Sequence, residues 1–318
     1  MAPSLPARPA WRPDIEGLRG LAVALVVCFH AGLPLFRGAF IAVDVFFVLS
    51  GFFLTRTLTR YLADGGDIDL TEVYARRVWR LLPTMAVVLV ATIAMALLLY
   101  APIDRAAVAE NMRPVAFFAG NLIFAADGVN YFSAGENPLL HTWTLGVEYQ
   151  LVLIFPVVVM LLAWIGKRRA AHVESDSARH VMIMRTVFWG IMIVGALSFA
   201  LSVWSSSAAP MWAYFGPHTR LWAFAAGGVM AFLVGAGQSV FRTSTNSIAT
   251  AQVVGIAAIV VPAFVYDRSM SYPGLIALVP VGGTVLILAG GAAAAETAIG
   301  RALASAPLSW LGRISYPL

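Results

Sequence analysis

The chain has 318 residues and a formal net charge of +5; 60% of its residues are hydrophobic, 12% are charged, and the mean hydropathy is +0.82. These values exclude an ordinary soluble domain and are typical of a protein that crosses a membrane several times. The basic residues lie in short clusters between apolar runs, which argues against a nucleic-acid partner and favours a role in orienting the chain in a membrane. The sequence therefore predicts an all-α, polytopic integral membrane helical bundle.

Apolar runs long enough to cross about 30 Å of hydrocarbon follow one another along most of the chain. They lie at 18–36, 38–57, 81–101, 143–165, 184–204, 219–237, 248–266 and 273–294. A further run starts near residue 306 and is incomplete at Leu318. We therefore expect one transmembrane domain over residues 1–318, with about nine to ten spans of which the last is incomplete.

The charge distribution predicts the orientation. Residues 113–127 are apolar but short and interrupted by Asn121, and if they do not cross, sixteen of the twenty-one basic residues fall on one side. The positive-inside rule makes that side the cytoplasm. We expect a bacterial inner-membrane protein with a cytoplasmic N-terminus, an outer segment over 102–142 and a cytoplasmic segment over 166–183.

The first apolar run carries a polar stripe. Arg12, Glu16 and Arg19 share one helical face, and His30, eleven residues after Arg19, returns to that face about 16 Å further along the axis. This spacing predicts Arg19 at the cytoplasmic end of the span and His30 in the outer third of the bilayer.

Two carboxylates are expected at a depth similar to that of His30. Asp44 lies in the second run and Glu148 in the run at 143–165. Ionisable groups are costly within a bilayer and are usually functional, so we predict a shared catalytic site of His30, Asp44 and Glu148 with Arg19 below it. Each residue also has a structural interpretation, since a histidine can hydrogen-bond between helices, an arginine can snorkel and an aspartate can pair with an arginine.

Further candidates lie at the two membrane edges. Arg76, Arg77 and Arg80 form a basic cytoplasmic face that fits a phosphate clamp, although topology alone also explains it. His141 lies on the same helical face as Glu148, and Trp143 fits either an acceptor site or an interfacial aromatic belt. The residues that we predict to contact substrate are His141, Trp143, Glu16 and Ser50. His172 and His180 lack further ligand spacing, so no metal site is expected.

In chain order, these motifs resemble the signatures of membrane acyltransferase family 3, bacterial integral-membrane O-acyltransferases of cell-surface sugars. The motifs are Arg-Pro-Asp-Ile-Glu-Gly-Leu-Arg-Gly at 12–20, Val-Asp-Val-Phe-Phe-Val-Leu-Ser-Gly-Phe at 43–52, Arg-Arg-x-x-Arg-Leu-Leu-Pro at 76–83, His-Thr-Trp-Thr-Leu-Gly-Val-Glu at 141–148 and Leu-Ser-Trp-Leu-Gly-Arg-Ile-Ser-Tyr-Pro-Leu at 308–318. Tyr149 stands where the family often has a second acidic residue. The His-Thr-Trp form resembles members fused to an SGNH-type domain; no Gly-Asp-Ser motif occurs here, and the unfinished last run favours a truncated chain.

The resemblance implies transfer of an acyl group, acetyl above all, from cytoplasmic acyl-coenzyme A to a hydroxyl of a cell-envelope glycan or a lipid-linked sugar. Acyl-coenzyme A would be a substrate, and no tightly bound cofactor is expected. His30 would act as general base, oriented by Asp44 or Glu148, or would accept the acyl group itself. The alternative is a proton-coupled transporter or exporter of an anionic or acylated substrate, against which the lack of evident internal repeats argues.

Overall fold

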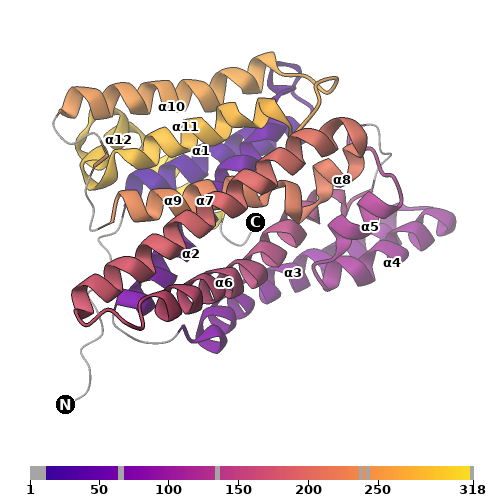
Figure 1. The fold of residues 1–318 in the computed structure, drawn as a ribbon. Helices are drawn as coiled ribbons and strands as arrows, with labels where there is room; N and C mark the ends of the chain where they lie inside the picture. Colours follow the sequence, from indigo (N-terminus) through magenta and orange to yellow (C-terminus); the bar gives the residue numbers. More distant parts are fainter. Residues whose placement is uncertain (1–11, 64–67, 133–136, 236–238, 241–243, 316–318) are drawn as a thin grey trace.

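The computed structural model describes residues 12–63, 68–132, 137–235, 239–240 and 244–315, and all regular elements in these ranges are helical (Figure 1). In the described part of the chain the longer helices are α1 (Pro13–His30), α2 (Val43–Ala63), α3 (Leu70–Leu99), α4 (Pro102–Ala116), α6 (Trp143–Arg169), α7 (Asp176–Ala208), α9 (Leu221–Leu233), α10 (Thr245–Val265) and α11 (Leu278–Ala289). The shorter helices are α5 (Gly120–Ala126), α8 (Pro210–Phe215), α12 (Ala298–Leu303) and α13 (Ala306–Ile314). The predicted all-α class is confirmed.

Five helical segments in the described residues are long and apolar enough to cross a membrane: Ala39–Ala63, Leu70–Leu99, Leu140–Arg169, Asp176–Ala208 and Thr245–Val265. Two shorter apolar segments, Leu221–Leu233 and Leu275–Ala289, correspond to the runs expected at 219–237 and 273–294. The α1 helix has 18 residues, and its first two turns carry Asp14, Glu16 and Arg19. The protein is therefore a membrane helical bundle whose regular helices are in part shorter than the apolar runs.

The segment at 113–127 does not form a single long helix. It is divided between α4 and α5, and the chain between them passes through Phe118, whose φ of 54° interrupts the helix. With 15 and 7 residues, the two helices are about 22 Å and 11 Å long, less than the hydrocarbon thickness. This division agrees with the prediction that 113–127 does not cross the membrane.

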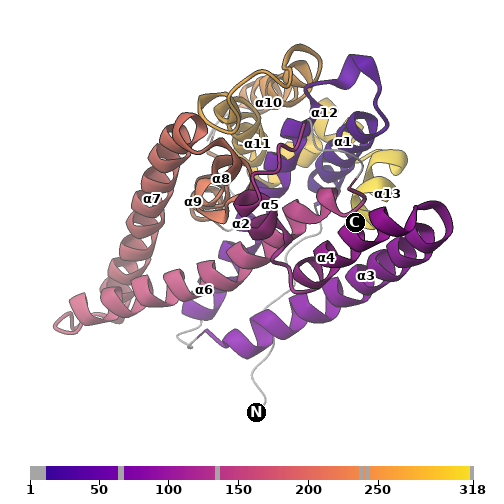
Figure 2. The ribbon, with the colours of Figure 1, turned by 90° about the vertical axis from the view of Figure 1, so that its right-hand side faces the viewer.

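The centre of the bundle is the contact between α2 and α9. A Cβ atom at Gly51 would lie 1.9 Å from the carbonyl oxygen of Phe224, and one at Gly227 would lie 1.8 Å from that of Val48. The two backbones therefore approach more closely than any larger residue would allow, as small residues permit in membrane helix pairs. Figure 2 shows α3 and α4 at one edge of this centre and α7 at another, with α1 packed beside α13.

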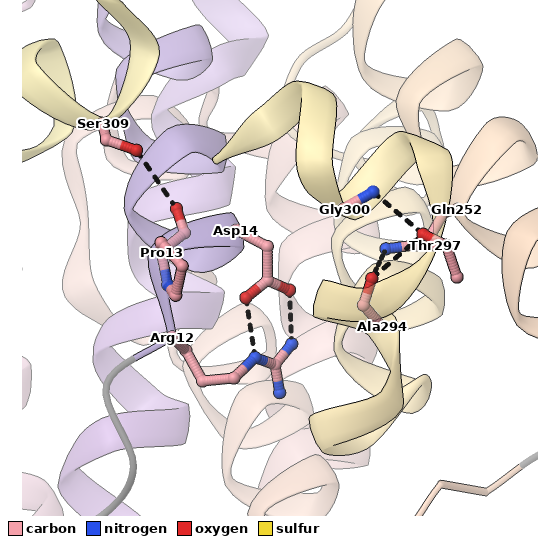
Figure 3. A network of polar contacts seen from close by, with 8 residues as sticks. All are labelled: Arg12, Pro13, Asp14, Gln252, Ala294, Thr297, Gly300 and Ser309. Atoms are coloured by element: carbon pink, nitrogen blue, oxygen red, sulfur yellow. Dashed lines mark hydrogen bonds and ion pairs between the residues drawn. The ribbon is translucent and has the colours of Figure 1, made fainter. Parts of the chain in front are cut away.

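Two groups of polar contacts lie at the start of α1 and between α10 and the C-terminal helices (Figure 3). The guanidinium of Arg12 donates two hydrogen bonds, of 2.7 and 2.6 Å, to the fully buried carboxylate of Asp14. Gln252 of α10 donates to the carbonyl of Ala294 at 3.0 Å and accepts a hydrogen bond from Thr297, which also caps α12. Buried side chains of Asp14 and Gln252 thus have partners, as buried polar groups require.

The predicted orientation can be tested by cysteine labelling. Asn130 and Ser175 are both exposed, the first in the expected outer segment and the second at the N-cap of α7 in the expected cytoplasmic segment. In a Cys28→Ser background, an impermeant thiol reagent should label Asn130→Cys and Ser175→Cys from opposite sides of the membrane. Labelling of both positions from one side would contradict the orientation.

Candidate active site

His30 is the last residue of α1, and its ring is fixed by two hydrogen bonds. Its Nδ1 lies 2.8 Å from the carbonyl oxygen of Val26, and its Nε2 lies 2.9 Å from the hydroxyl of Tyr131. Because a carbonyl only accepts, Nδ1 must carry the proton of the neutral ring, and the lone pair is on Nε2. Nε2 is therefore the basic and nucleophilic atom, and the tautomer is held by Val26 rather than by Asp44 or Glu148. The sequence predicted that a carboxylate would hold this tautomer. In the structure the acceptor is the backbone carbonyl of Val26, one helical turn before His30.

Tyr131, which the sequence analysis did not single out, is the residue in contact with this nitrogen. Its ring lies parallel to that of Phe29, with centroids 6.4 Å apart, and stacks on Tyr214 at 4.8 Å. Burial raises the pKa of Tyr131 to about 12, so the phenol remains a donor at neutral pH. The available sequence signal was weak: an aromatic pair, Tyr131-Phe132, in a polar part of the expected outer segment.

Replacing Tyr131 by phenylalanine should lower turnover by about 10-fold, the effect of losing one hydrogen bond of about 1.4 kcal/mol that orients the reacting group. The apolar ring would still pack on Phe29 and Tyr214, so the midpoint of thermal unfolding should change little. Steady-state kinetics should show the loss in kcat, with donor KM nearly unchanged. A pure loss of donor affinity would argue against a positioning role for Tyr131.

A cavity of about 250 Å³ lies between α1, α2, α3 and α6, and its lining along α1 ends at Val27. Its walls are mostly apolar, and its charged and hydroxyl side chains come from five elements or their ends: Arg19, Ser50, Arg77, Glu148 and Ser315. Ser50 donates a hydrogen bond of 2.6 Å to the Glu148 carboxylate. The fold thus places four predicted site residues, Arg19, Ser50, Arg77 and Glu148, around one space. The side chains of Arg76 and Arg80 are outside those that the structure describes.

Asp44 lies elsewhere, in a fully buried ion pair. Arg220 donates a hydrogen bond of 3.1 Å to one carboxylate oxygen, and the hydroxyl of Tyr272 donates to the other at 2.7 Å. The guanidinium of Arg220 also lies over the Tyr272 ring at 4.4 Å and near the Trp143 ring at 5.5 Å. Both Asp44 oxygens are therefore held by groups from the C-terminal half of the chain. The catalytic role expected for Asp44 stays a prediction, while its structural role is visible in these contacts.

The other residues predicted to contact substrate, Trp143, His141 and Glu16, lie in different places. Trp143 is buried and its ring lies 4.8 Å from Tyr214 and 6.1 Å from Tyr131, so it forms part of the aromatic wall behind His30 rather than an interfacial belt. His141 is exposed, and its protonated form would be repelled by that of His30. Glu16 faces α13, where one of its oxygens lies 4.0 Å from Arg313. Among the side chains that the structure describes, no group of three or more His, Cys, Asp or Glu residues is arranged to hold a metal ion.

A second pocket, of about 470 Å³, opens at the C-terminal end of α1. It is lined by Phe29 and by residues that follow α1 and α10, among them Arg37 and Arg268. Along α1, the first cavity touches Arg19, Val23, Val26 and Val27, and the second begins at Phe29. His30 therefore lies on α1 where the lining of one space ends and that of the other begins.

Comparison with known proteins places this arrangement in a family. A family model described as an acyltransferase domain, that of acyltransferase family 3, matches residues 12–318. The chain is 32% identical over 307 residues to a protein of Komagataeibacter xylinus named as a candidate membrane-bound transacylase, BcsY, with 96% of this chain and 70% of that protein covered. It is 31% identical over 224 residues to a candidate O-acetyltransferase of Staphylococcus aureus strain MSSA476, with 70% of this chain and 35% of that protein covered.

The O-acetyltransferase OatA of Staphylococcus aureus strain NCTC 8325 is 29% identical over 226 residues, with 71% of this chain and 35% of that protein covered. The matched part is thus about a third of the length of these staphylococcal relatives. No solved structure matches the chain significantly. The family model extends over nearly the whole sequence and every motif described above, and on that basis the chain belongs to membrane acyltransferase family 3.

Proposed function

We propose that the protein is an integral-membrane O-acyltransferase that moves an acetyl group from cytoplasmic acyl-coenzyme A to a hydroxyl of a cell-envelope glycan on the outer side of the inner membrane. The observation that carries the proposal is the course of α1, which leads from Arg19 in the first cavity to His30, the residue that follows Phe29 of the second pocket. Family membership and the relatives' names, O-acetyltransferase and transacylase, support acyl transfer. The sequence's charge distribution supports a cytoplasmic N-terminus.

The first cavity suits the donor. Arg19 and Arg77 supply guanidinium groups to its lining, and arginine forks bind phosphate in a bidentate manner. Val23, Val26 and Val27 provide an apolar path along α1 toward His30, suited to the uncharged arm of the coenzyme and its acyl group. The carboxylate of Glu148, held by Ser50, places one negative charge in the same cavity and limits its net positive charge.

Replacing Arg77 by glutamine should weaken acetyl-coenzyme A binding by about 10-fold, and more at low salt, where the lost attraction is least screened. Isothermal titration of the purified protein at two salt concentrations measures both effects. Arg179→Gln is a matched control, because Arg179 is a partly exposed arginine of the expected cytoplasmic segment, paired with Asp176 and remote in sequence from the cavity-lining residues. Equal donor affinity in the two variants would leave Arg77 with a topological role only.

The chemistry follows from the tautomer of His30. As the acceptor oxygen attacks the thioester carbonyl carbon, Nε2 takes the hydroxyl proton; the tetrahedral intermediate then expels the coenzyme thiolate, which recovers the proton from the imidazolium. The carbonyl of Val26 accepts from Nδ1–H throughout and so stabilises the imidazolium. In the relay variant of this route, Nε2 attacks the thioester carbonyl and the coenzyme leaves as its thiolate, which gives an acyl-imidazolium with its proton still on Nδ1. The acceptor hydroxyl then attacks the acyl carbon, which frees the neutral imidazole, and the hydroxyl proton neutralises the thiolate. Both routes use the same atom, and both need no tightly bound cofactor.

Mass spectrometry of envelope glycans tests the function in the cell. A strain that lacks the gene should lose O-acetyl esters from one glycan class, the intact gene should restore them, and a His30→Ala allele should not. If the deletion instead left O-acetylation intact and abolished the appearance of an anionic or acylated molecule outside the cell, the exporter interpretation would replace the enzyme.

A further inference from the structure

The second pocket carries an unusual concentration of positive charge for the outer side of a membrane protein. Of the twenty-one basic residues, five fall outside in the predicted orientation, and two of these five, Arg37 and Arg268, line this pocket. Positive residues are disfavoured on that side, so topology does not account for their presence. A role in binding explains why both are found in one place.

Arg268 lies beside the residues that hold the reacting nitrogen. Its guanidinium carbon is 5.6 Å from the centroid of the Phe29 ring, and one of its nitrogens is 3.5 Å from the carbonyl oxygen of Phe132. Phe29 precedes His30 in α1, and Phe132 follows Tyr131, whose hydroxyl bonds to Nε2. A group bound to Arg268 would therefore be held next to the His30–Tyr131 pair.

The pocket remains positive when its acidic residue is included. Asp267 accepts hydrogen bonds at one carboxylate oxygen from the backbone nitrogen and the hydroxyl of Ser269, at 2.7 and 2.5 Å. The pocket lining thus has one carboxylate and two guanidinium groups, those of Arg37 and Arg268, which are both exposed. Guanidinium groups favour carboxylate or phosphate ligands over neutral hydroxyls, because they form charge-assisted, bidentate hydrogen bonds with them.

We propose that this pocket binds a negatively charged group, carboxylate or phosphate, of the acceptor saccharide and thereby holds a nearby hydroxyl at Nε2 of His30. The protein would then select anionic acceptors over neutral ones of the same shape. This inference rests on the proposed function, in which the acceptor approaches from the outer side.

Thermal unfolding of the purified full chain in uncharged detergent tests the proposal with glucuronate and glucose as probes, at equal concentration and with ionic strength matched by sodium chloride. A ligand that binds the folded state alone must raise the unfolding midpoint. Glucuronate at about ten times its dissociation constant should raise the midpoint of the wild-type protein by about 2 °C or more, and glucose should raise it less. The Arg37→Gln/Arg268→Gln double variant should lose at least about 10-fold in glucuronate affinity.

Two controls separate this pocket from other sites. Arg77→Gln should keep the glucuronate response, because an anion bound in the donor cavity would depend on Arg77. Arg301→Gln, which removes an exposed arginine outside the residues that line either space, should also keep it. Equal responses to glucuronate and glucose, or a glucuronate response unchanged in the double variant, would overturn the proposal. So would a response, dependent on Arg37 and Arg268, to phosphatidylglycerol but not to glucuronate, since that result would identify a lipid site.

The response of the same samples to acetyl-coenzyme A distinguishes this inference from the proposed function. Stabilisation by acetyl-coenzyme A without the selective glucuronate response would leave the acyltransferase standing and remove the anionic pocket. A glucuronate response of the expected kind without any effect of acetyl-coenzyme A would retain the anion site and count against the proposed donor.

Discussion

Acetyl transfer is expected to fall at least about 100-fold when His30 is replaced by alanine, the loss typical of removing a general base. Nε2 of His30 carries the lone pair of the neutral ring, because the ring's other nitrogen donates to the Val26 carbonyl. His30 is exposed at the end of α1, so its removal should leave folding and donor binding nearly unchanged. Transfer kinetics of the reconstituted protein, alongside acetyl-coenzyme A titration, measure both quantities.

A matched histidine controls for general damage. His172→Ala changes an exposed histidine in the turn after α6 and should retain wild-type transfer. If His30→Ala also retained transfer within a few-fold of wild type, neither the base nor the relay mechanism could hold, although the family assignment would stand.

The second large effect is on stability. Asp44→Leu should lower the free energy of unfolding by about 3–5 kcal/mol, because it leaves the charge of Arg220 buried without its carboxylate partner. Arg220 is fully buried and Asp44 is 1% exposed, so little solvent is available to compensate. Denaturation of the detergent-solubilised variant, followed by helix content, measures the loss.

A double variant separates structure from catalysis at this position. Asp44→Leu/Arg220→Met removes both charges and should be more stable than Asp44→Leu alone, since no unpaired charge remains buried. A double variant as unstable as the single one would show that the ion pair is not the source of the loss. If the double variant is folded and binds donor but transfers no acetyl group, the catalytic role predicted for Asp44 gains support.

The sequence predicted features that depend on local patterns. Apolar run length and charge predicted the all-α membrane bundle and a segment at 113–127 that does not cross the membrane, where the structure has two short helices. Spacing along one helix placed Arg19 and His30 toward opposite ends of α1, and the structure has Arg19 in one cavity and His30 beyond it. The lengths of the runs and the Arg19–His30 spacing are both distances along a helix axis, which the sequence specifies directly.

Contacts between distant segments could not be predicted in this way. Asp44 and Ser50 are both in α2, but six residues correspond to a rotation of about 240°, so Ser50 faces Glu148 and Asp44 faces Arg220. Counting residues from the end of a span predicts the depth of Asp44 in the membrane but not the side of α2 on which its side chain lies. The Asp44–Arg220 pair spans 176 residues and the His30–Tyr131 pair spans 101, and no local pattern specifies either partner.

Transfer across a sealed bilayer tests the central claim most directly. Vesicles reconstituted with oriented protein receive radiolabelled acetyl-coenzyme A only on the side of Arg77 and an envelope-glycan acceptor only on the side of Arg268. We predict that label appears as an O-acetyl ester on the acceptor with wild-type protein and at a rate at least about 100-fold lower with His30→Ala. Ester formation only when donor and acceptor share one side, or an equal rate with His30→Ala, would contradict the account.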